Sequence, residues 1–243
     1  MTTGSAHAER MTSVVDVLVV DDHRSFGDAM RIAVDLQPGL RCRTAVPSAE
    51  AALAAIGEDD CPDVVLLDVG LPGMDGITAI RELTARCPDV RIILLSADTS
   101  AETLLAAVEA GAHGFLPKSF PFTRVLQLVQ SVEEDVIAEP LSLERALLLA
   151  ADGRDRSDAA HELDLTEREY EILLLLGEGM PVKQAAKQLH MSVNTCRGHV
   201  ASLLRKFDVH SQLAAVVAAA KMGLLPNLRS TTSPAPTNFD RWR

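Results

Sequence analysis

The sequence predicts an α/β domain followed by an all-α domain. Five apolar runs alternate with helical segments in the first half of the chain, which is typical of a doubly wound, five-stranded parallel sheet. The second half contains only helical patterns, and two of its helices are joined by a short turn. Residues 12–131 carry 17 acids and 9 bases, whereas residues 163–229 carry 6 acids and 8 bases. These observations indicate two domains with different partners.

The domain boundaries follow from composition. The first domain covers residues 14–132, and the helical domain covers residues 163–226. Between them, residues 133–162 form an acidic linker in which Leu141–Ala151 is helix-prone. Residues 227–243 are rich in Ser, Thr and Pro, which predicts a disordered tail.

Three predicted strands, at Val14–Val20, Val64–Leu67 and Val90–Leu95, are rich in Val, Ile and Leu, a composition that suits strands buried on both faces. Two shorter strands are predicted at Cys42–Val46 and Gly114–Leu116. The segments between them show helical spacing of apolar residues or are bounded by Pro, Gly and a capping Ser. We expect helices at Ser25–Leu36, Ala49–Ile56, Ile77–Leu83, Glu102–Ala110 and Phe122–Val132.

Polar residues follow four of the five strands. Asp21 and Asp22 follow the first strand, Asp68 the third, Ser96 the fourth and Lys118 the fifth. In a doubly wound sheet the carboxyl ends of the strands share one edge, where ligands bind. We therefore expect three carboxylates, one hydroxyl and one ammonium to converge there.

Such a cluster has a definite chemistry. Adjacent carboxylates repel one another and require a cation, and oxygen ligands with room for water favour Mg²⁺. A carboxylate beside that ion can accept a phosphoryl group whose oxygens are held by Ser96 and Lys118. Asp68 is the candidate acceptor, and Asp21, Asp22 and Asp68 are the candidate metal ligands.

Residues 14–131 resemble the receiver domain of bacterial two-component response regulators, which has the CheY-like fold. The matching positions are the pair Asp21-Asp22, Asp68 in LLDVGLPGMDG, Ser96 followed by Ala97, and Lys118 in GFLPKS. The resemblance implies that a partner histidine kinase phosphorylates Asp68. It also implies that Gly70 lends a backbone carbonyl to the metal. Phe115 would be a switch aromatic that follows Ser96 inward.

The second domain begins with the capping box Thr166-Glu167-Arg168-Glu169. Its helices are predicted at Tyr170–Leu176, Lys183–Leu189, Val193–Phe207 and Gln212–Lys221. A tight turn joins the second helix to the third, which indicates a helix-turn-helix.

The third of these helices divides into a core face and an outward face that carries bases and no acid. Such a face suits entry into the DNA major groove, where Arg197 could contact guanine. The candidate DNA contacts are Lys183, Asn194, Thr195, Arg197, Gly198, Ala201, Arg205 and Lys206. An ordinary helical bundle with a solvated charged face is the alternative.

Residues 164–225 resemble the LuxR/NarL-type DNA-binding domain in LTEREYEILLLLGEGM, VKQAAKQLHMSVNTCRGHV and LLRKFDVHSQLAAVVAAAKMGLL. The resemblance implies double-stranded promoter DNA as a partner and a homodimer formed through the fourth helix. Ala201 replaces a base-contacting lysine common in the family, and Gly198 costs about 1 kcal/mol of helix stability relative to Ala. These departures predict weak, cooperative or shape-dependent DNA binding.

We expect a cytoplasmic transcriptional regulator controlled by phosphorylation, with no enzymatic activity. The alternative is a receiver-gated protein-interaction regulator with weak or no independent DNA binding. An aspartyl-phosphate hydrolase is disfavoured because Gly70 stands where its second acid is required. The acidic receiver also predicts that the unphosphorylated chain holds its recognition helix back.

The four cysteines, Cys42, Cys61, Cys87 and Cys196, are scattered and form no CxxC pair. This spacing disfavours both a zinc site and a disulfide, and predicts free thiols in a reducing compartment. The polar first eleven residues do not resemble a signal peptide, and no run of about 18 apolar residues predicts a membrane span.

Overall fold

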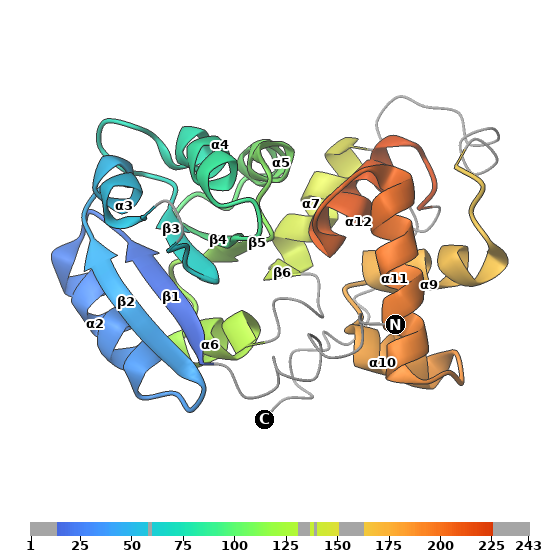
Figure 1. Ribbon diagram of the computed structural model, residues 1–243. Helices are drawn as coiled ribbons and strands as arrows, with labels where there is room; N and C mark the ends of the chain where they lie inside the picture. The colour runs from blue at the N-terminus through green and yellow to red at the C-terminus, as the bar shows by residue number, and fades with distance from the viewer. Residues whose placement is uncertain (1–13, 58–59, 131–136, 139, 151–162, 226–243) are drawn as a thin grey trace.

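A computed structural model describes residues 14–57, 60–130, 137–138, 140–150 and 163–225 of the 243-residue chain (Figure 1). The predicted tail and residues 151–162 of the predicted linker lie outside this part of the chain. Within the described ranges, no helix is long and apolar enough to cross a membrane.

The first domain is built on a parallel sheet with the strand order β2-β1-β3-β4-β5-β6. The strands are β1 (Val15–Val20), β2 (Leu40–Val46), β3 (Val64–Asp68), β4 (Arg91–Ser96), β5 (Gly114–Pro117) and β6 (Ile137–Ala138). The first five strands confirm the predicted sheet. The sixth is a correction, because Ile137 and Ala138 were assigned to the linker but pair with Gly114 and Phe115 of β5. This pairing covers backbone groups that β5 would otherwise present at the edge of the sheet.

Helices cover both faces of this sheet (Figure 1). The helices are α2 (Arg24–Asp35) and α6 (Phe122–Gln130) on one face, and α3 (Ala49–Ala55), α4 (Gly76–Arg86) and α5 (Ala101–Ala110) on the other. Successive strand residues point to opposite faces, so Leu66 packs in the first core and Leu67 in the second. Both cores are apolar, which explains why β3 is apolar at each of the four positions before Asp68.

Gly76 allows α4 to begin in contact with the end of β3. A Cβ atom at this position would lie 2.4 Å from the Asp68 carbonyl oxygen and 2.7 Å from the Val69 Cα atom. Both are backbone atoms, so no change of side-chain rotamer could relieve the clash. The absence of a side chain therefore sets the distance between α4 and the strand that carries Asp68.

Within residues 163–225 the second domain consists of four helices. They are α9 (Glu167–Gly177), α10 (Val182–Gln188), α11 (Val193–Phe207) and α12 (Gln212–Lys221). The predicted capping box is present, since Thr166 and Glu169 each accept a hydrogen bond from the other's backbone N–H. Helices α10 and α11 form the predicted helix-turn-helix, whose turn contains His190 in the left-handed conformation (φ 54°).

Helix α7 (Pro140–Ala150) lies between the two domains (Figure 1). The sequence predicted a short helix at this place, but within a linker. Instead, Leu143, Ala146 and Leu147 are buried, and α7 packs against both α5 and α12. Helix α12 also packs directly on α5. The two domains therefore share one continuous apolar core.

Two cysteines form a disulfide, so the prediction of four free thiols is wrong. Cys61 precedes β3 and Cys87 follows α4, and the disulfide joins them with their Cα atoms 5.8 Å apart. Strand β3 begins at the amino edge of the sheet, and α4 ends near the same edge. Cys61 and Cys87, which are separated by 26 positions in the sequence, therefore lie close together. This spacing has no sequence signature. Cys42 and Cys196 are free.

A matched pair of glycine substitutions tests the contact between α4 and β3. Gly76→Ala should destabilise the chain by about 1–3 kcal/mol, because the added methyl group overpacks against backbone. Gly198→Ala lies in α11 with nothing within 4 Å of the added Cβ. It should stabilise the chain by about 0.5–1 kcal/mol through helix propensity. Urea unfolding measures both changes, and a Gly76→Ala chain as stable as the wild type would contradict the close approach.

Candidate functional sites

Two buried carboxylates and one ammonium meet at the carboxyl edge of the sheet. Asp21 follows β1, Asp68 ends β3 and Lys118 follows β5. The Lys118 Nζ atom lies 2.7 Å from Asp21 Oδ2 and 2.7 Å from Asp68 Oδ2. Asp21 is 4% exposed and Asp68 is 5% exposed. The lysine therefore compensates two negative charges that burial would otherwise penalise.

These neighbours keep the Lys118 ammonium charged. Burial opposes protonation, but hydrogen bonds and charge interactions with Asp21 and Asp68 outweigh it and raise the pKa of Lys118 above its ordinary value. The ammonium also lies 5.2 Å from the centroid of the Phe26 ring, a cation–π contact. The acidic cluster thus contains a fixed positive charge and hydrogen-bond donor.

The same edge offers a set of oxygen ligands. Asp21, Asp22, His23 and Asp68 each place one potential ligand atom within 4.8 Å of the others. Asp21 Oδ2 is buried, and its partner among the described residues is the Lys118 ammonium. One ammonium is shared between two carboxylates, so the cluster keeps an excess of negative charge. The acidic cluster therefore fits a hard divalent cation of the Mg²⁺ type.

Sequence reasoning missed His23. Its Nδ1 atom lies 2.7 Å from Asp22 Oδ1, and its backbone N–H donates to Asp21 Oδ1 at 2.9 Å. His23 is the N-cap residue of α2. Its place directly after the acidic pair was the available sequence signal.

The loop after β3 fixes the orientation of the Asp68 carboxylate. The Gly70 N–H donates to Asp68 Oδ1 at 3.1 Å, while Lys118 holds Oδ2. Further along, the Met74 N–H donates to Glu50 Oε1 at 3.0 Å, which ties the loop to α3. Both oxygens of Asp68 therefore have defined partners.

Ser96 and Phe115 lie on the strands next to this site. Ser96 ends β4, is 1% exposed, and accepts a hydrogen bond from the Asp98 N–H at 3.0 Å. Phe115 of β5 stands opposite Leu94 and is fully buried in the core that also contains α4 and α5. The Lys118 N–H donates to the Ser96 carbonyl at 2.8 Å, which links the ends of β4 and β5.

The outward face of α11 is open to solvent. The exposed candidates are Asn194, Thr195, Arg197, Gly198, Ala201 and Arg205 on α11, and Lys183 on α10. The first domain packs against α12. It thus contacts the Ala- and Val-rich surface of α12 and not the charged face of α11. Whether the unphosphorylated chain holds its recognition helix back stays a prediction, and any such restraint would not act by covering this face of α11.

Lys206 makes an internal ion pair. Its Nζ atom lies 2.7 Å from Glu169 Oε2 and also contacts the Asp164 carbonyl oxygen. Burial raises the pKa of Glu169, but hydrogen bonds from Lys206, Ser202 and Thr166 outweigh it and lower that pKa to about 2. Lys206 thereby fastens the end of α11 to the start of α9, and its contact with DNA phosphate stays a prediction.

Comparison with known proteins identifies the family. The profile for the response regulator receiver domain matches residues 17–130, and the profile for bacterial regulatory proteins of the luxR family matches residues 163–219. The transcriptional activator protein ExaE of Pseudomonas putida is 33% identical over 213 residues, which cover 86% of this chain and 97% of ExaE. The chain belongs to the NarL/LuxR family of two-component response regulators.

Other NarL/LuxR regulators match at similar length. The nitrate/nitrite response regulator protein NarL of Escherichia coli is 28% identical, covering 83% of this chain and 93% of NarL. A homolog of that protein in Haemophilus influenzae is 29% identical, covering 85% of this chain and 97% of its own length. This chain is therefore a receiver-controlled, DNA-binding transcriptional regulator, and not an enzyme.

Solved structures agree in fold. A two-component response regulator of the LuxR family from an Aurantimonas species is 25% identical with a TM-score of 0.51, covering 58% of this chain and all of its own. The RcsB response regulator of Salmonella typhimurium is 23% identical with a TM-score of 0.50, covering 85% of this chain and 97% of its own. The second likeness concerns the fold alone.

The Glu169–Lys206 pair predicts a pH dependence of stability. Because folding lowers the pKa of Glu169 from 4.5 to about 2, its contribution is complete above pH 4.5 and is lost as the pH falls toward 2. Glu169→Gln should therefore lower the free energy of unfolding by about 2–3 kcal/mol at pH 7, and by less at pH 3.5.

Near-ultraviolet circular dichroism of Tyr170, the only tyrosine, follows unfolding of this domain in the full chain. Glu171→Gln is the matched control, since Glu171 pairs with Arg168 near the surface and should change stability by less than about 1 kcal/mol. A stability difference between Glu169→Gln and wild type that does not vary with pH would contradict the assignment.

Proposed function

We propose that Asp68 accepts a phosphoryl group from a partner histidine kinase, and that its phosphorylation frees α12 for dimerisation on promoter DNA. The observation that supports Asp68 as the phosphoacceptor is the position of its carboxylate. It lies at a strand end, oriented by Gly70 and Lys118, beside the buried Asp21. The family assignment supports a kinase as the phosphoryl donor.

The transfer requires little rearrangement of these residues. A carboxylate oxygen of Asp68 attacks the phosphorus of the phosphohistidine, the P–N bond breaks as the P–O bond forms, and the imidazole leaves. The Lys118 ammonium, which already contacts Asp68, would then pair with a phosphoryl oxygen. Asp21, Asp22, Asp68 and the Gly70 carbonyl would hold Mg²⁺. When bound, this ion would neutralise charge on the phosphoryl group.

The proposal that phosphorylation frees α12 rests on the residues that cover this helix. Every residue of α12 is buried or half-buried, and the helix packs on α5 and α7. Ser211 Oγ donates to the Ala112 carbonyl at 3.3 Å, and Lys221 Nζ lies 2.5 Å from Glu109 Oε1. A dimer formed through α12, as the family resemblance implies, cannot coexist with this packing. We therefore propose that the receiver restrains the regulator by occupying its dimerisation helix.

A short stretch of backbone could connect the two sites. Ala112, which accepts the hydrogen bond from Ser211, lies three residues before Phe115 at the entry to β5. Phe115 and Ser96 stand on neighbouring strands next to Asp68. We propose that phosphorylation draws Ser96 toward the phosphoryl group, that Phe115 moves in response, and that the α5–β5 turn then loses its fit to α12.

One feature of α11 favours the alternative of a protein-interaction regulator. Gly198 and Ala201 are exposed on its outward face and offer no polar group to base edges. Phosphorylation would then promote dimerisation without DNA recognition. The experiment that tests Asp68 also separates these two functions.

The test uses the full chain, treated with acetyl phosphate and Mg²⁺. Wild type should incorporate one phosphoryl group, form dimers, and protect DNA upstream of its own gene roughly 5- to 150-fold more tightly at fixed salt, the usual range of allosteric coupling. Asp68→Asn should show none of these changes. Asp75→Asn is the matched control, because Asn can replace Asp75 as the N-cap of α4 in the same loop.

Phosphorylation of the Asp68→Asn chain at the wild-type level would refute Asp68 as the acceptor. Phosphorylated dimers that leave no footprint at low salt would establish the protein-interaction alternative. Dimerisation and footprints that do not depend on phosphorylation would refute the proposed control of α12.

A further inference from the structure

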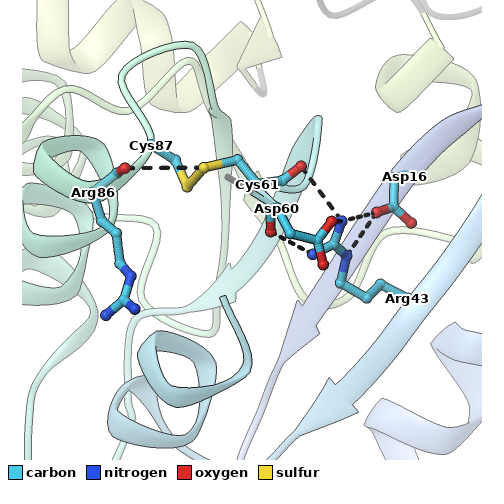
Figure 2. The surroundings of a disulfide bond; sticks show 6 residues. All are labelled: Asp16, Arg43, Asp60, Cys61, Arg86 and Cys87. Carbon is cyan, nitrogen blue, oxygen red and sulfur yellow. Dashed lines mark hydrogen bonds and ion pairs between the residues drawn. A yellow bond between two sulfur atoms is a disulfide. The ribbon is translucent and has the colours of Figure 1, made fainter. Parts of the chain in front are cut away.

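Figure 2 shows the disulfide between Cys61 and Cys87. Because Asp68 ends β3 and Cys61 precedes it, the disulfide lies at the sheet edge opposite the candidate phosphoacceptor. Cys61 stands before β3 and Cys87 stands after α4. The enclosed segment contains β3, Asp68, the loop after it and α4. The bond therefore closes a covalent ring around the unit that positions the candidate phosphoacceptor.

The two sulfur atoms differ in accessibility. Cys61 is exposed, whereas Cys87 is 1% exposed in the core beneath α4. Any thiol or disulfide that arrives from solvent must therefore react at Cys61, and Cys87 is the partner that resolves the reaction. Because only one sulfur is exposed, exchange with an external thiol or disulfide should begin at Cys61 in every case.

A network of charges holds the backbone of Cys61 in place without using its sulfur atom (Figure 2). The Arg43 guanidinium donates to the Cys61 carbonyl at 3.4 Å and to the Asp60 carbonyl at 2.6 Å. It also donates to the Asp60 and Asp16 carboxylates, at 2.8 Å and 2.6 Å. These bonds do not depend on the disulfide, so they should keep Cys61 near Cys87 after the sulfur–sulfur bond is broken.

The position at the end of α4 affects reactivity. The Cys61 Sγ atom lies 3.9 Å from the Arg86 carbonyl oxygen, at the carboxyl end of the helix. The partial negative charge of a helix carboxyl end disfavours a thiolate. A reduced Cys61 could instead donate a weak S–H hydrogen bond to that carbonyl.

A DNA-binding regulator acts in the compartment that holds the DNA, where low-molecular-weight thiols keep most cysteines reduced. Disulfides are rare in such compartments, and those that occur are usually transient or redox-sensing. We propose that Cys61 and Cys87 form a reversible redox site that exchanges with low-molecular-weight thiols and disulfides. Its closure locks the β3–α4 unit of the receiver. This inference concerns stability and does not depend on phosphorylation of Asp68.

Closure proceeds in two balanced exchanges. The Cys61 thiolate attacks a small disulfide RSSR, which forms a Cys61–SR bond and releases one RS⁻. The Cys87 thiol gives its proton to solvent and attacks Cys61 Sγ, which forms the internal disulfide and releases the second RS⁻. Two protein thiols are oxidised and RSSR is reduced to two thiols. Reduction reverses these steps, beginning with attack of RS⁻ on Cys61.

The test equilibrates the full chain in mixtures of glutathione and glutathione disulfide, and measures the intact mass after alkylation and the urea midpoint. Oxidised wild type should lose two hydrogens. Its unfolding equilibrium constant should fall roughly 30- to 900-fold, the range that typical disulfides give. Transient glutathione adducts should map to Cys61. Cys61→Ser should show no redox-dependent shift, whereas the control Cys42→Ser, which removes a free cysteine, should behave as wild type.

Three outcomes would overturn the proposal: no internal disulfide at any glutathione ratio, a disulfide that leaves the urea midpoint unchanged, or adducts that map to Cys42. Cys87→Ser provides a second check, because it should retain a glutathione adduct on Cys61 that no longer resolves. Acetyl phosphate labelling of reduced and oxidised wild type keeps this site separate from the proposed function, since both forms should be labelled at Asp68.

Discussion

The Lys118 ammonium between two buried carboxylates is the interaction on which the receiver site depends. A parallel sheet brings the ends of β1, β3 and β5 to one edge, and this geometry forces Asp21 and Asp68 close together in poorly hydrated surroundings. Without a cation the two charges would repel and neither would be well solvated. Lys118 relieves that repulsion but supplies one positive charge for two carboxylates. The excess negative charge is what a divalent cation would compensate.

The second constraint is that α12 has one apolar surface and two potential partners. In the monomer this surface packs on α5 and α7, and the apolar core continues through it from one domain to the other. The exposed Lys221–Glu109 ion pair contributes little energy by itself, so apolar contact and the Ser211–Ala112 hydrogen bond carry the interface. Competition between two partners for one helix gives a physical basis for control that needs no obstruction of α11.

The sequence contains enough information for the strands, the helix-turn-helix and the strand-end residues, because each depends on local patterns. Uniform apolar runs predict doubly buried strands, and the residues after them reach a common edge through topology alone. His23 was missed because its only signal in the sequence is its place directly after the acidic pair. The two-residue strand β6 and the Cys61–Cys87 pairing depend on contacts between segments distant in the chain, which local periodicity cannot reveal. The same holds for Lys206, whose charge suggested DNA while its contact with the buried Glu169 appears only in three dimensions.

Surface charge does not show how the two domains pack. The first domain is acidic and the outward face of α11 is basic, yet that face is exposed and the domains meet through apolar residues. Burial of apolar surface contributes more than attraction between hydrated charges separated by solvent. The charge of each domain therefore indicates its external partner and does not indicate how the two domains pack on each other.

Hydrogen exchange of the full chain, with and without acetyl phosphate and Mg²⁺, tests the central claim most directly. If phosphorylation frees α12, the amides of residues 212–221 and of the turn at residues 111–113 should exchange at least about tenfold faster in phosphorylated monomers, at concentrations too low for dimers. Unchanged exchange in both segments, in a sample fully phosphorylated on Asp68, would contradict the account.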